Sequence, residues 1–206
     1  MSHAATARLF VAIDPPRAVR EQLAAWARLA IAGDERREAR RHAGKVRLLE
    51  PETLHLTLCF LGARPVQELA QIAAAVQGIG AFELQLSLGA PLWLPPRRPR
   101  TLALAVHDRD GELARLHGSV VDALAEAIDW RPERRRFRAH ITVARLGREH
   151  SRERRSESDD EPSLTATPQL SFAARQVVLY RSWLAPAGAS YEPLGASATD
   201  ESSSED

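Results

Sequence analysis

The stretch that decides the fold is LHLTLCFL, residues 54–61. Side chains two positions apart in a β-strand point to the same side, so His55 and Thr57 share one face. The opposite face is apolar and carries Leu54, Leu56, Leu58 and Phe60. We therefore predict a strand whose apolar face is covered by helices and whose polar face presents an imidazole and a hydroxyl.

A second stretch of the same kind, FRAHITVARL, occupies residues 137–146. Its His140 and Thr142 again stand two apart, with Ile141 and Val143 on the opposite face, so we predict a strand over 138–146. The two histidines are 85 positions apart, at corresponding places in two similar runs of strands and helices. An internal duplication explains this spacing. It would set the two strands side by side across a pseudo-twofold axis, facing a shared cleft.

The rest of the chain alternates between strand and helix patterns. Asp14 is placed to cap the first helix, whose first turn accommodates Pro15 and Pro16 and which we expect to end near Ala30. Apolar spacing predicts two further helices at 65–78 and 111–129. Further strands are expected at 8–14, 46–49, 82–88, 101–107, 175–184 and 191–194. The predicted fold class is α+β: a bilobal, pseudo-twofold fold with mainly antiparallel sheets facing a central cleft and helices outside.

Three segments are too polar to join a packed core. Residues 33–45 (GDERREARRHAGK) lack an apolar face and are expected to form a charged loop, and residues 148–163 form a second charged insertion. Residues 196–206 are expected to be a disordered acidic and Ser-rich tail. The predicted organisation is therefore one bilobal domain over residues 1–195, interrupted by two charged insertions.

Composition places few limits on function. The chain has 206 residues and a formal charge of +1, and Lys45 is its single lysine, so arginine carries nearly all of the positive charge. Guanidinium groups suit phosphate contacts. The one cysteine, Cys59, lies in an apolar run and is expected to be a packed thiol. With no apolar run of about 18 residues and no signal-peptide pattern, we expect a cytoplasmic protein without a membrane span.

Two facing imidazoles are suited to acid–base chemistry at a phosphodiester. One ring accepts a proton from an attacking water while the other donates a proton to the departing ribose oxygen, and no metal or other cofactor is needed. The pKa of histidine lies near neutrality, so one ring can be neutral while the other is protonated. The hydroxyls of Thr57 and Thr142 can donate hydrogen bonds to the non-bridging phosphate oxygens.

Other catalytic patterns are weaker. No HExxH or CxxC motif accompanies the two histidines, which disfavours a zinc site. Ser119 and Ser182 lack the setting of a nucleophile elbow, which disfavours a serine hydrolase. The remaining histidines lie at the terminus, in charged loops, at a strand end or in a helix, and we assign no role to His3, His42, His107, His117 and His150.

The chain resembles the 2H phosphoesterases, specifically RNA 2′,3′-cyclic phosphodiesterases of the LigT type, once called 2′-5′ RNA ligases. The matching segments are RLFVAID at the start, LHLTLCFLG from Leu54, FRAHITVARL from Phe137 and VVLYRSWLAPAGASY from Val177. They span nearly the whole chain. The resemblance implies hydrolysis of RNA 2′,3′-cyclic phosphate ends to 2′-phosphomonoesters by the two histidines of paired HxTx motifs.

The same resemblance implies individual roles. His55 would donate a proton to the leaving 3′ oxygen and His140 would activate water. Thr57 and Thr142 would orient the phosphate, Arg145 would help to neutralise it, and Phe60 would flank the nucleoside. Strict alternation puts Arg145 on the face opposite His140, so it reaches the cleft only where the strand ends or bulges. The stretch PRTLALAV from Pro99 lacks the tryptophan that the family pattern has after Pro-Arg, which puts base stacking there in doubt.

Two alternatives to hydrolysis remain open at this level. A nucleotide- or RNA-binding module could keep the cleft without turnover, although the presence of both histidines and both threonines argues against it. Joining RNA ends through a 2′,5′ linkage is the same chemistry in reverse, and equilibrium in water favours hydrolysis. We expect a monomer whose partners are RNA ends with a 2′,3′-cyclic phosphate or related cyclic nucleotides.

Overall fold

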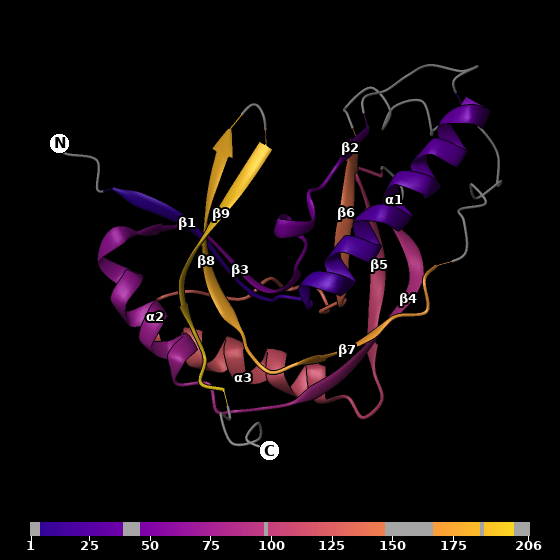
Figure 1. The fold of residues 1–206 in the computed structure, drawn as a ribbon. Coiled ribbons are helices and arrows are strands. Elements are labelled where there is room, and N and C mark those ends of the chain that lie inside the picture. Colours follow the sequence, from indigo (N-terminus) through magenta and orange to yellow (C-terminus); the bar gives the residue numbers. More distant parts are fainter. Residues whose placement is uncertain (1–4, 39–45, 97–98, 147–166, 186–187, 200–206) are drawn as a thin grey trace.

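A computed structural model describes residues 5–38, 46–96, 99–146, 167–185 and 188–199. The strands form one nine-stranded sheet in which all neighbours pair antiparallel (Figure 1). Its order is β7 (Ser171–Ala174), β4 (Leu84–Leu94), β5 (Thr101–Asp108), β6 (His140–Leu146), β3 (Leu56–Pro65), β1 (Thr6–Ile13), β8 (Val178–Ala185) and β9 (Gly188–Ala196). The short strand β2 (Val46–Leu48) pairs with the end of β6, on the same edge of β6 as β3.

The sheet is symmetric about the junction of β3 and β6. One half has the order β9-β8-β1-β3 and the other β7-β4-β5-β6, so the two histidine-bearing strands meet at the centre. The recorded register of this junction is a single pair, Leu56 opposite Ile141. Both side chains are fully buried. The predicted α+β class and pseudo-twofold arrangement are confirmed, with the two halves joined into one continuous sheet.

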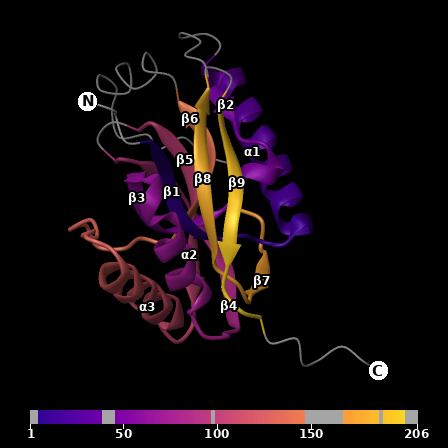
Figure 2. The ribbon, with the colours of Figure 1, turned by 90° about the vertical axis from the view of Figure 1, so that its left-hand side faces the viewer.

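The helices cover the apolar side of this sheet. Helix α1 (Arg17–Glu38) follows β1 but packs against β2 and β6 of the other half, whereas α3 (Glu112–Ala127) follows β5 and packs against β3 (Figures 1 and 2). Helix α2 (Leu69–Gln77) lies beside α3. Short 3₁₀ helices, η1 (Pro51–Thr53) and η2 (Val66–Glu68), precede β3 and α2. The helices thus cross between the halves, and one hydrophobic core runs beneath the whole sheet.

The ends of the first helix differ from the prediction. Helix α1 continues to Glu38, eight residues past Ala30, because the Arg and Glu residues that follow favour helix even without an apolar face. The prediction of a loop over 33–45 is therefore wrong for residues 33–38, and residues 39–45 lie outside the described part of the chain. At the other end, Pro16 offers its carbonyl to the amides of Val19 and Arg20. The Asp14 carboxylate instead accepts a hydrogen bond from Tyr180.

The C-terminal region also differs in detail. The predicted strand over 175–184 is β8, which begins at Val178 and not at residue 175, and the strand β7 that precedes it was not predicted. The predicted tail begins too early, because Ala196 belongs to β9 and the Ser197 side chain is buried. Ser197 donates its amide to the carbonyl of Val177, and its hydroxyl accepts from the Val177 amide. The charged segment 148–163 and residues 200–206 lie outside the described residues.

Cys59 is a packed thiol, as predicted. Its side chain is buried on the helix side of β3, and burial raises the pKa of the thiol to about 12. A thiol with such a pKa is protonated and inert at neutral pH. Within the described part of the chain, no helix is both long and apolar enough to cross a membrane.

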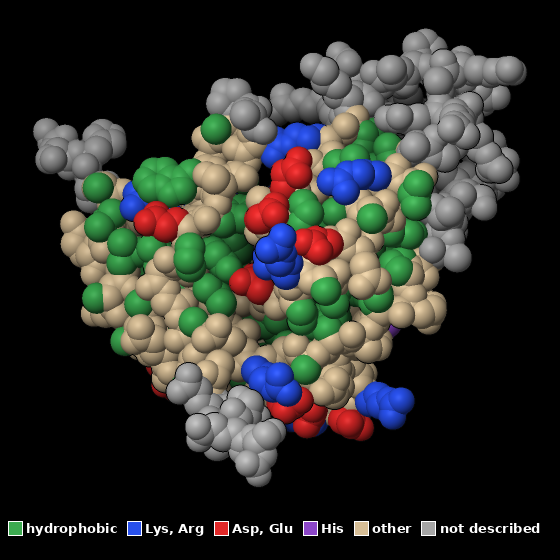
Figure 3. Space-filling model, viewed as in Figure 1, with side chains coloured by type: hydrophobic (Ala, Val, Ile, Leu, Met, Phe, Trp, Pro, Cys, Tyr) green, Lys and Arg blue, Asp and Glu red, His purple; other side chains and the backbone are tan. Residues whose placement is uncertain are grey.

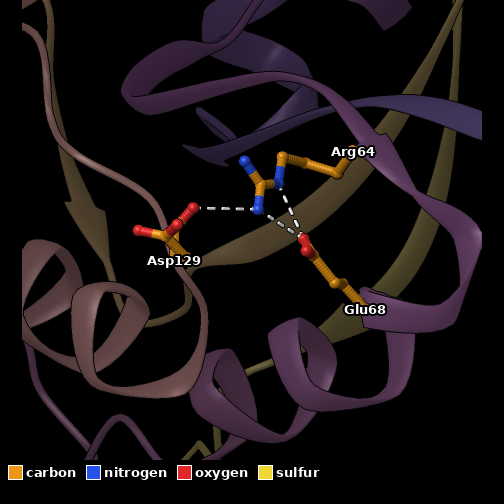
Figure 4. Close-up of polar contacts among 3 residues, drawn as sticks. All are labelled: Arg64, Glu68 and Asp129. Atoms are coloured by element: carbon orange, nitrogen blue, oxygen red, sulfur yellow. Dashed lines mark hydrogen bonds and ion pairs between the residues drawn. The ribbon is translucent and has the colours of Figure 1, made fainter.

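A half-buried arginine ties β3 to the helical layer. Arg64 donates through Nε to Glu68 at 2.7 Å and through Nη2 to the backbone carbonyl of Asp129 at 3.1 Å (Figure 4). The Arg64 and Glu68 side chains are only 17% and 23% exposed. Because Asp129 lies just beyond α3 and Glu68 just before α2, one guanidinium group links three segments of the same half.

We predict that Arg64→Ala lowers the free energy of unfolding by about 1–3 kcal/mol, because a half-buried carboxylate and a carbonyl lose a charged donor. Urea denaturation followed by circular dichroism measures this change. Arg17→Ala is the matched control, since the Arg17–Glu21 pair is 85% and 52% exposed and its loss should leave the free energy of unfolding almost unchanged. Equal effects of the two substitutions would contradict the assignment.

Candidate active site

The polar face of the sheet carries a pocket of about 290 Å³ at the junction of the two halves. One half contributes residues of β1, β3, β8 and β9, and the other contributes residues of β2 and β6 (Figure 1). All six residues proposed from the sequence line it: His55, Thr57, Phe60, His140, Thr142 and Arg145. Two segments more than 80 residues apart therefore supply one site.

The register of the central junction explains how the two motifs meet. Leu56 is opposite Ile141, so the antiparallel ladder places His55 opposite Thr142 and Thr57 opposite His140. The two histidines are then diagonal neighbours on one face, a relation that separates residues by about 7–8 Å in antiparallel sheets. This separation allows two imidazoles to approach one phosphate from different sides. His55 itself lies one residue before β3, and His140 is the first residue of β6.

A backbone carbonyl two residues earlier holds each imidazole. His55 Nδ1 lies 2.8 Å from the carbonyl oxygen of Thr53, and His140 Nδ1 lies 2.7 Å from that of Arg138. A carbonyl only accepts hydrogen bonds, so each Nδ1 carries the proton and donates it. Each Nε2 is therefore the nitrogen that is free to exchange a proton with a substrate. The same device in both halves is a consequence of the pseudo-twofold arrangement.

A bulge after each threonine turns two more side chains into the pocket. On β6 the pairing with β5 shifts between Thr142 and Ala144, so Val143 is an extra residue. On β3 the pairing with β1 shifts in the same way, and Leu58 is the extra residue. Two successive residues then point into the core, and the next one faces the pocket.

The bulges correct the expectation from strict alternation. Phe60 and Arg145 occupy the same offset from their histidines, and both face the pocket although alternation assigned them to the apolar side. The sequence contains a pattern from which these bulges could have been predicted. Consecutive apolar residues after each threonine, Leu58-Cys59 and Val143-Ala144, break the period of two that an unbulged strand would keep.

The two histidines have different surroundings. The His55 ring is flanked by Phe10, with ring centroids 4.8 Å apart, and by the edge of Tyr191 at 5.1 Å. Phe10 also stacks on Tyr180, whose hydroxyl donates a 2.5 Å hydrogen bond to Asp14. In the other half, the β5 residue opposite His140 is an alanine, Ala105. His55 is therefore enclosed by aromatic rings on its own half of the sheet.

This enclosure affects the proton affinity of His55. Burial lowers the pKa of its imidazole, and the positive charge of Arg145 and any positive charge on His140 act in the same direction. The hydrogen bond to Thr53 and the negative charge of Asp14 oppose the shift without cancelling it. A lowered pKa means that His55 is mostly neutral at pH 7 in the free protein, and that a negatively charged ligand would favour its protonated form.

Several pocket residues were not found from the sequence. They include Arg8, Phe10, Arg47, Ser182 and Tyr191, along with Leu49, Thr53 and apolar residues of β8 and β9. Arg8 stacks on Phe60, with its guanidinium carbon 4.6 Å from the ring centroid. Tyr191 is the last residue of the stretch VVLYRSWLAPAGASY quoted from the sequence, but only the pairing of β9 with β8 brings it beside His55. Residues this far apart give no local signal of a shared site.

Two described histidines lie outside the His-x-Thr motifs. The described histidines outside the motifs, His107 and His117, do not line the pocket. His117 instead stacks on Phe137 with ring centroids 4.1 Å apart. Among the described residues, no group of three or more His, Cys, Asp or Glu side chains is arranged to hold a metal ion. Basic and acidic side chains intermingle on the face shown in Figure 3, which therefore has no broad basic surface. The arginines of the pocket differ from the other arginines in lying beside the two histidines.

Comparisons with known proteins agree with this geometry. The model of the 2′-5′ RNA ligase superfamily matches residues 10–182. An RNA 2′,3′-cyclic phosphodiesterase of Archaeoglobus fulgidus is 31% identical over 144 residues, which cover 69% of this chain and 74% of that protein. Among solved structures, a phosphoesterase superposes with a TM-score of 0.70 at 26% identity, covering 93% and 97% of the two chains. Escherichia coli LigT without ligand gives 0.66 at 25% identity, covering 94% and 98%.

We predict that Asp14→Asn shifts the titration of His55 to lower pH. The Asp14 carboxylate favours the imidazolium form, so its removal takes away one of the two interactions that oppose the lowering of the pKa. The chemical shift of the His55 Cε1–H proton, followed by NMR against pH, measures the change. Asp129→Asn is the control and should leave His55 unaffected; an unchanged or raised pKa in Asp14→Asn would refute the prediction.

Proposed function

The chain belongs to the 2′-5′ RNA ligase superfamily, and from this premise we propose that it is an RNA 2′,3′-cyclic phosphodiesterase. It hydrolyses the cyclic phosphate at an RNA 3′ end to a 2′-phosphomonoester. The observation that carries the proposal is the pair of imidazoles, each held through Nδ1 by a carbonyl, lining one pocket with Arg145. Curated relatives bear the same activity in their names.

The reaction needs one base and one acid. His140 Nε2 accepts a proton from water as the water oxygen attacks phosphorus. The bond between phosphorus and the 3′ oxygen breaks, and His55 Nε2 donates its proton to that oxygen. The products are a free 3′ hydroxyl and a phosphate that remains on the 2′ oxygen. One proton enters and one leaves the pair of imidazoles, so a second proton exchange with water restores the starting state.

The surrounding residues stabilise the charge that develops on phosphate. The hydroxyls of Thr57 and Thr142, which line the same pocket as the histidines, donate to the non-bridging oxygens. Arg145 adds a permanent positive charge. Phe60 presents a ring that is 39% exposed, on which the nucleoside can stack. These groups supply the chemistry without a metal ion, and the reaction needs only one copy of the chain.

The assignment of His55 as the acid depends on the substrate. Burial favours neutral His55 in the free protein, and a bound phosphodiester anion raises the pKa of an adjacent imidazole. The substrate would thus help to protonate the group that later donates to its own leaving oxygen. His140, in the more open half of the pocket, is left to act as the base.

We predict that His55→Ala and His140→Ala each lower kcat/KM by about 10²- to 10⁴-fold on an RNA oligonucleotide ending in a 2′,3′-cyclic phosphate. The double variant should lose little more than either single variant, because both groups act in one step. His107→Ala is the control, since His107 lies outside the pocket. Chromatographic separation of 2′- and 3′-phosphate products, with chelator present, checks both the regiochemistry and the independence from metal.

Wild-type protein that binds the oligonucleotide but leaves the cyclic phosphate intact would identify a binding module instead. Histidine variants that retain full activity would refute the two-histidine mechanism. Formation of a 2′,5′ linkage from a cyclic phosphate and a 5′ hydroxyl, by the same residues, would show the reverse reaction.

We predict a different outcome for the two histidines when the 3′ oxygen of the cyclic phosphate is replaced by sulfur. A thiolate leaves without protonation, so His55→Ala should recover most of its activity on this substrate, whereas His140→Ala should stay impaired because water still needs a base. Single-turnover rates on the oxygen and sulfur substrates measure the difference. Recovery by His140→Ala in place of His55→Ala would reverse the two assignments.

A further inference from the structure

Two arginines of the pocket face each other across β2 and β6. Arg47 and Arg145 are register partners in this antiparallel pair, and both line the pocket. Directly opposite side chains project from the same face, with Cβ atoms about 4.5–5.5 Å apart, and like charges in such positions destabilise a sheet. An anion bound by both guanidinium groups would remove this repulsion.

No acidic side chain in the described part of the chain balances the two arginines. Neither takes part in an ion pair or side-chain hydrogen bond with a described residue, and the described charged residues that line the pocket are Arg8, Arg47 and Arg145. A cyclic phosphodiester carries one negative charge. It would therefore leave surplus positive charge in the pocket, which a ligand with a second phosphate would use.

The Arg47 side chain reaches across the pocket to a glycine of the other half. Its guanidinium group occupies the space that a Cβ would take on Gly188, the first residue of β9. Gly188 has a φ of 143°, a conformation that other residues rarely adopt. The guanidinium is thus placed before any ligand arrives, so less side-chain entropy is lost when it binds an anion.

The third arginine is engaged differently. Arg8 lies over the Phe60 ring, so it forms part of the proposed stacking surface for the nucleoside. The Arg47–Arg145 pair is then the place where a further phosphate group can be bound by two planar donors. In RNA, the phosphate nearest to a terminal cyclic phosphate is the one esterified to the 5′ oxygen of the same ribose.

We propose that Arg47 and Arg145 form a second anion subsite, which binds the phosphate on the 5′ oxygen of the terminal nucleotide while its cyclic phosphate lies between His55 and His140; Arg145 is shared by the two phosphates, and Arg47 serves the second phosphate alone. The subsite rests on the proposed function and makes it more specific. It selects nucleotides that carry a 5′ phosphate, and so RNA chains, over nucleoside 2′,3′-cyclic monophosphates.

The test compares three substrates that share one terminal base. They are a nucleoside 2′,3′-cyclic monophosphate, the same compound with a 5′-phosphate, and a dinucleotide ending in the cyclic phosphate. For wild-type protein we expect kcat/KM to be about 10- to 100-fold higher with either 5′ substituent than without it, the range of a charged hydrogen bond. A gain with the dinucleotide but not with the 5′-phosphate would show that the subsite requires the phosphodiester of an RNA chain.

Substitutions test whether Arg47 is responsible for the higher kcat/KM with a 5′ substituent. Arg47→Ala should bring the ratio of kcat/KM values close to one, and Arg47→Lys should keep part of it because lysine retains the charge without the planar fork. Gly188→Ala should lower the ratio, because the added methyl group displaces the Arg47 guanidinium group. In protein that already carries Arg47→Ala, Gly188→Ala should not change the ratio any further. Arg181→Ala is the matched control, since Arg181 stacks on Trp183 at 3.8 Å and does not line the pocket.

The outcomes separate the subsite from the proposed function. Hydrolysis of all three substrates with equal kcat/KM would overturn the subsite and leave the phosphodiesterase activity standing. A preference that survives in Arg47→Ala would also overturn it. Hydrolysis of none of the three would refute the proposed function itself, and the subsite with it.

Discussion

The pairing of β3 with β6 is the constraint on which the site depends. Leu56 and Ile141 are buried on one side of this junction, and the alternation of strand side chains then places both histidines and both threonines on the other side. A slip by one residue would exchange the two faces, burying imidazoles in the core and exposing leucines. The hydrophobic core therefore determines the register, and the register determines the spacing of the catalytic groups. Crossed packing of α1 and α3 onto the opposite halves strengthens the same junction.

Departures from regular strand geometry complete the pocket. The extra residues Leu58 and Val143 each turn the following part of their strand, which brings Phe60 and Arg145 to the polar face. Each bulge interrupts the pairing of the strand at one residue and brings one more side chain into the site. Because the bulges occur at the same offset in both halves, they belong to the repeated unit. The two side chains at that offset nevertheless differ, so one half offers an aromatic surface and the other a positive charge.

The two histidines have equivalent positions in the two halves, but their surroundings differ. Both imidazoles are oriented by a carbonyl two residues earlier, which makes them equivalent donors and acceptors in geometry. Phe10 and Tyr191 flank the His55 ring, and burial lowers the pKa of His55. Two similar groups in different surroundings are a common way to assign opposite roles in proton transfer. Arg47, held against Gly188, adds a further difference between the two ends of the pocket.

The sequence by itself determined the strand faces, the duplicated histidine–threonine pattern, the α+β class and the six proposed site residues. The strand faces and the four His and Thr residues follow from periodicity, which is a local property of the chain, whereas Phe60 and Arg145 came from the family resemblance, because alternation assigned them to the apolar face. Local reasoning was wrong where long-range contacts prevailed, as at Asp14, which bonds Tyr180, and at Ser197, which pairs with Val177. Only the tertiary structure brought Tyr191 to His55 and set Arg47 opposite Arg145. The reason is physical: strand pairing and bulges are decided by partners distant in sequence, and no periodicity within one segment records them.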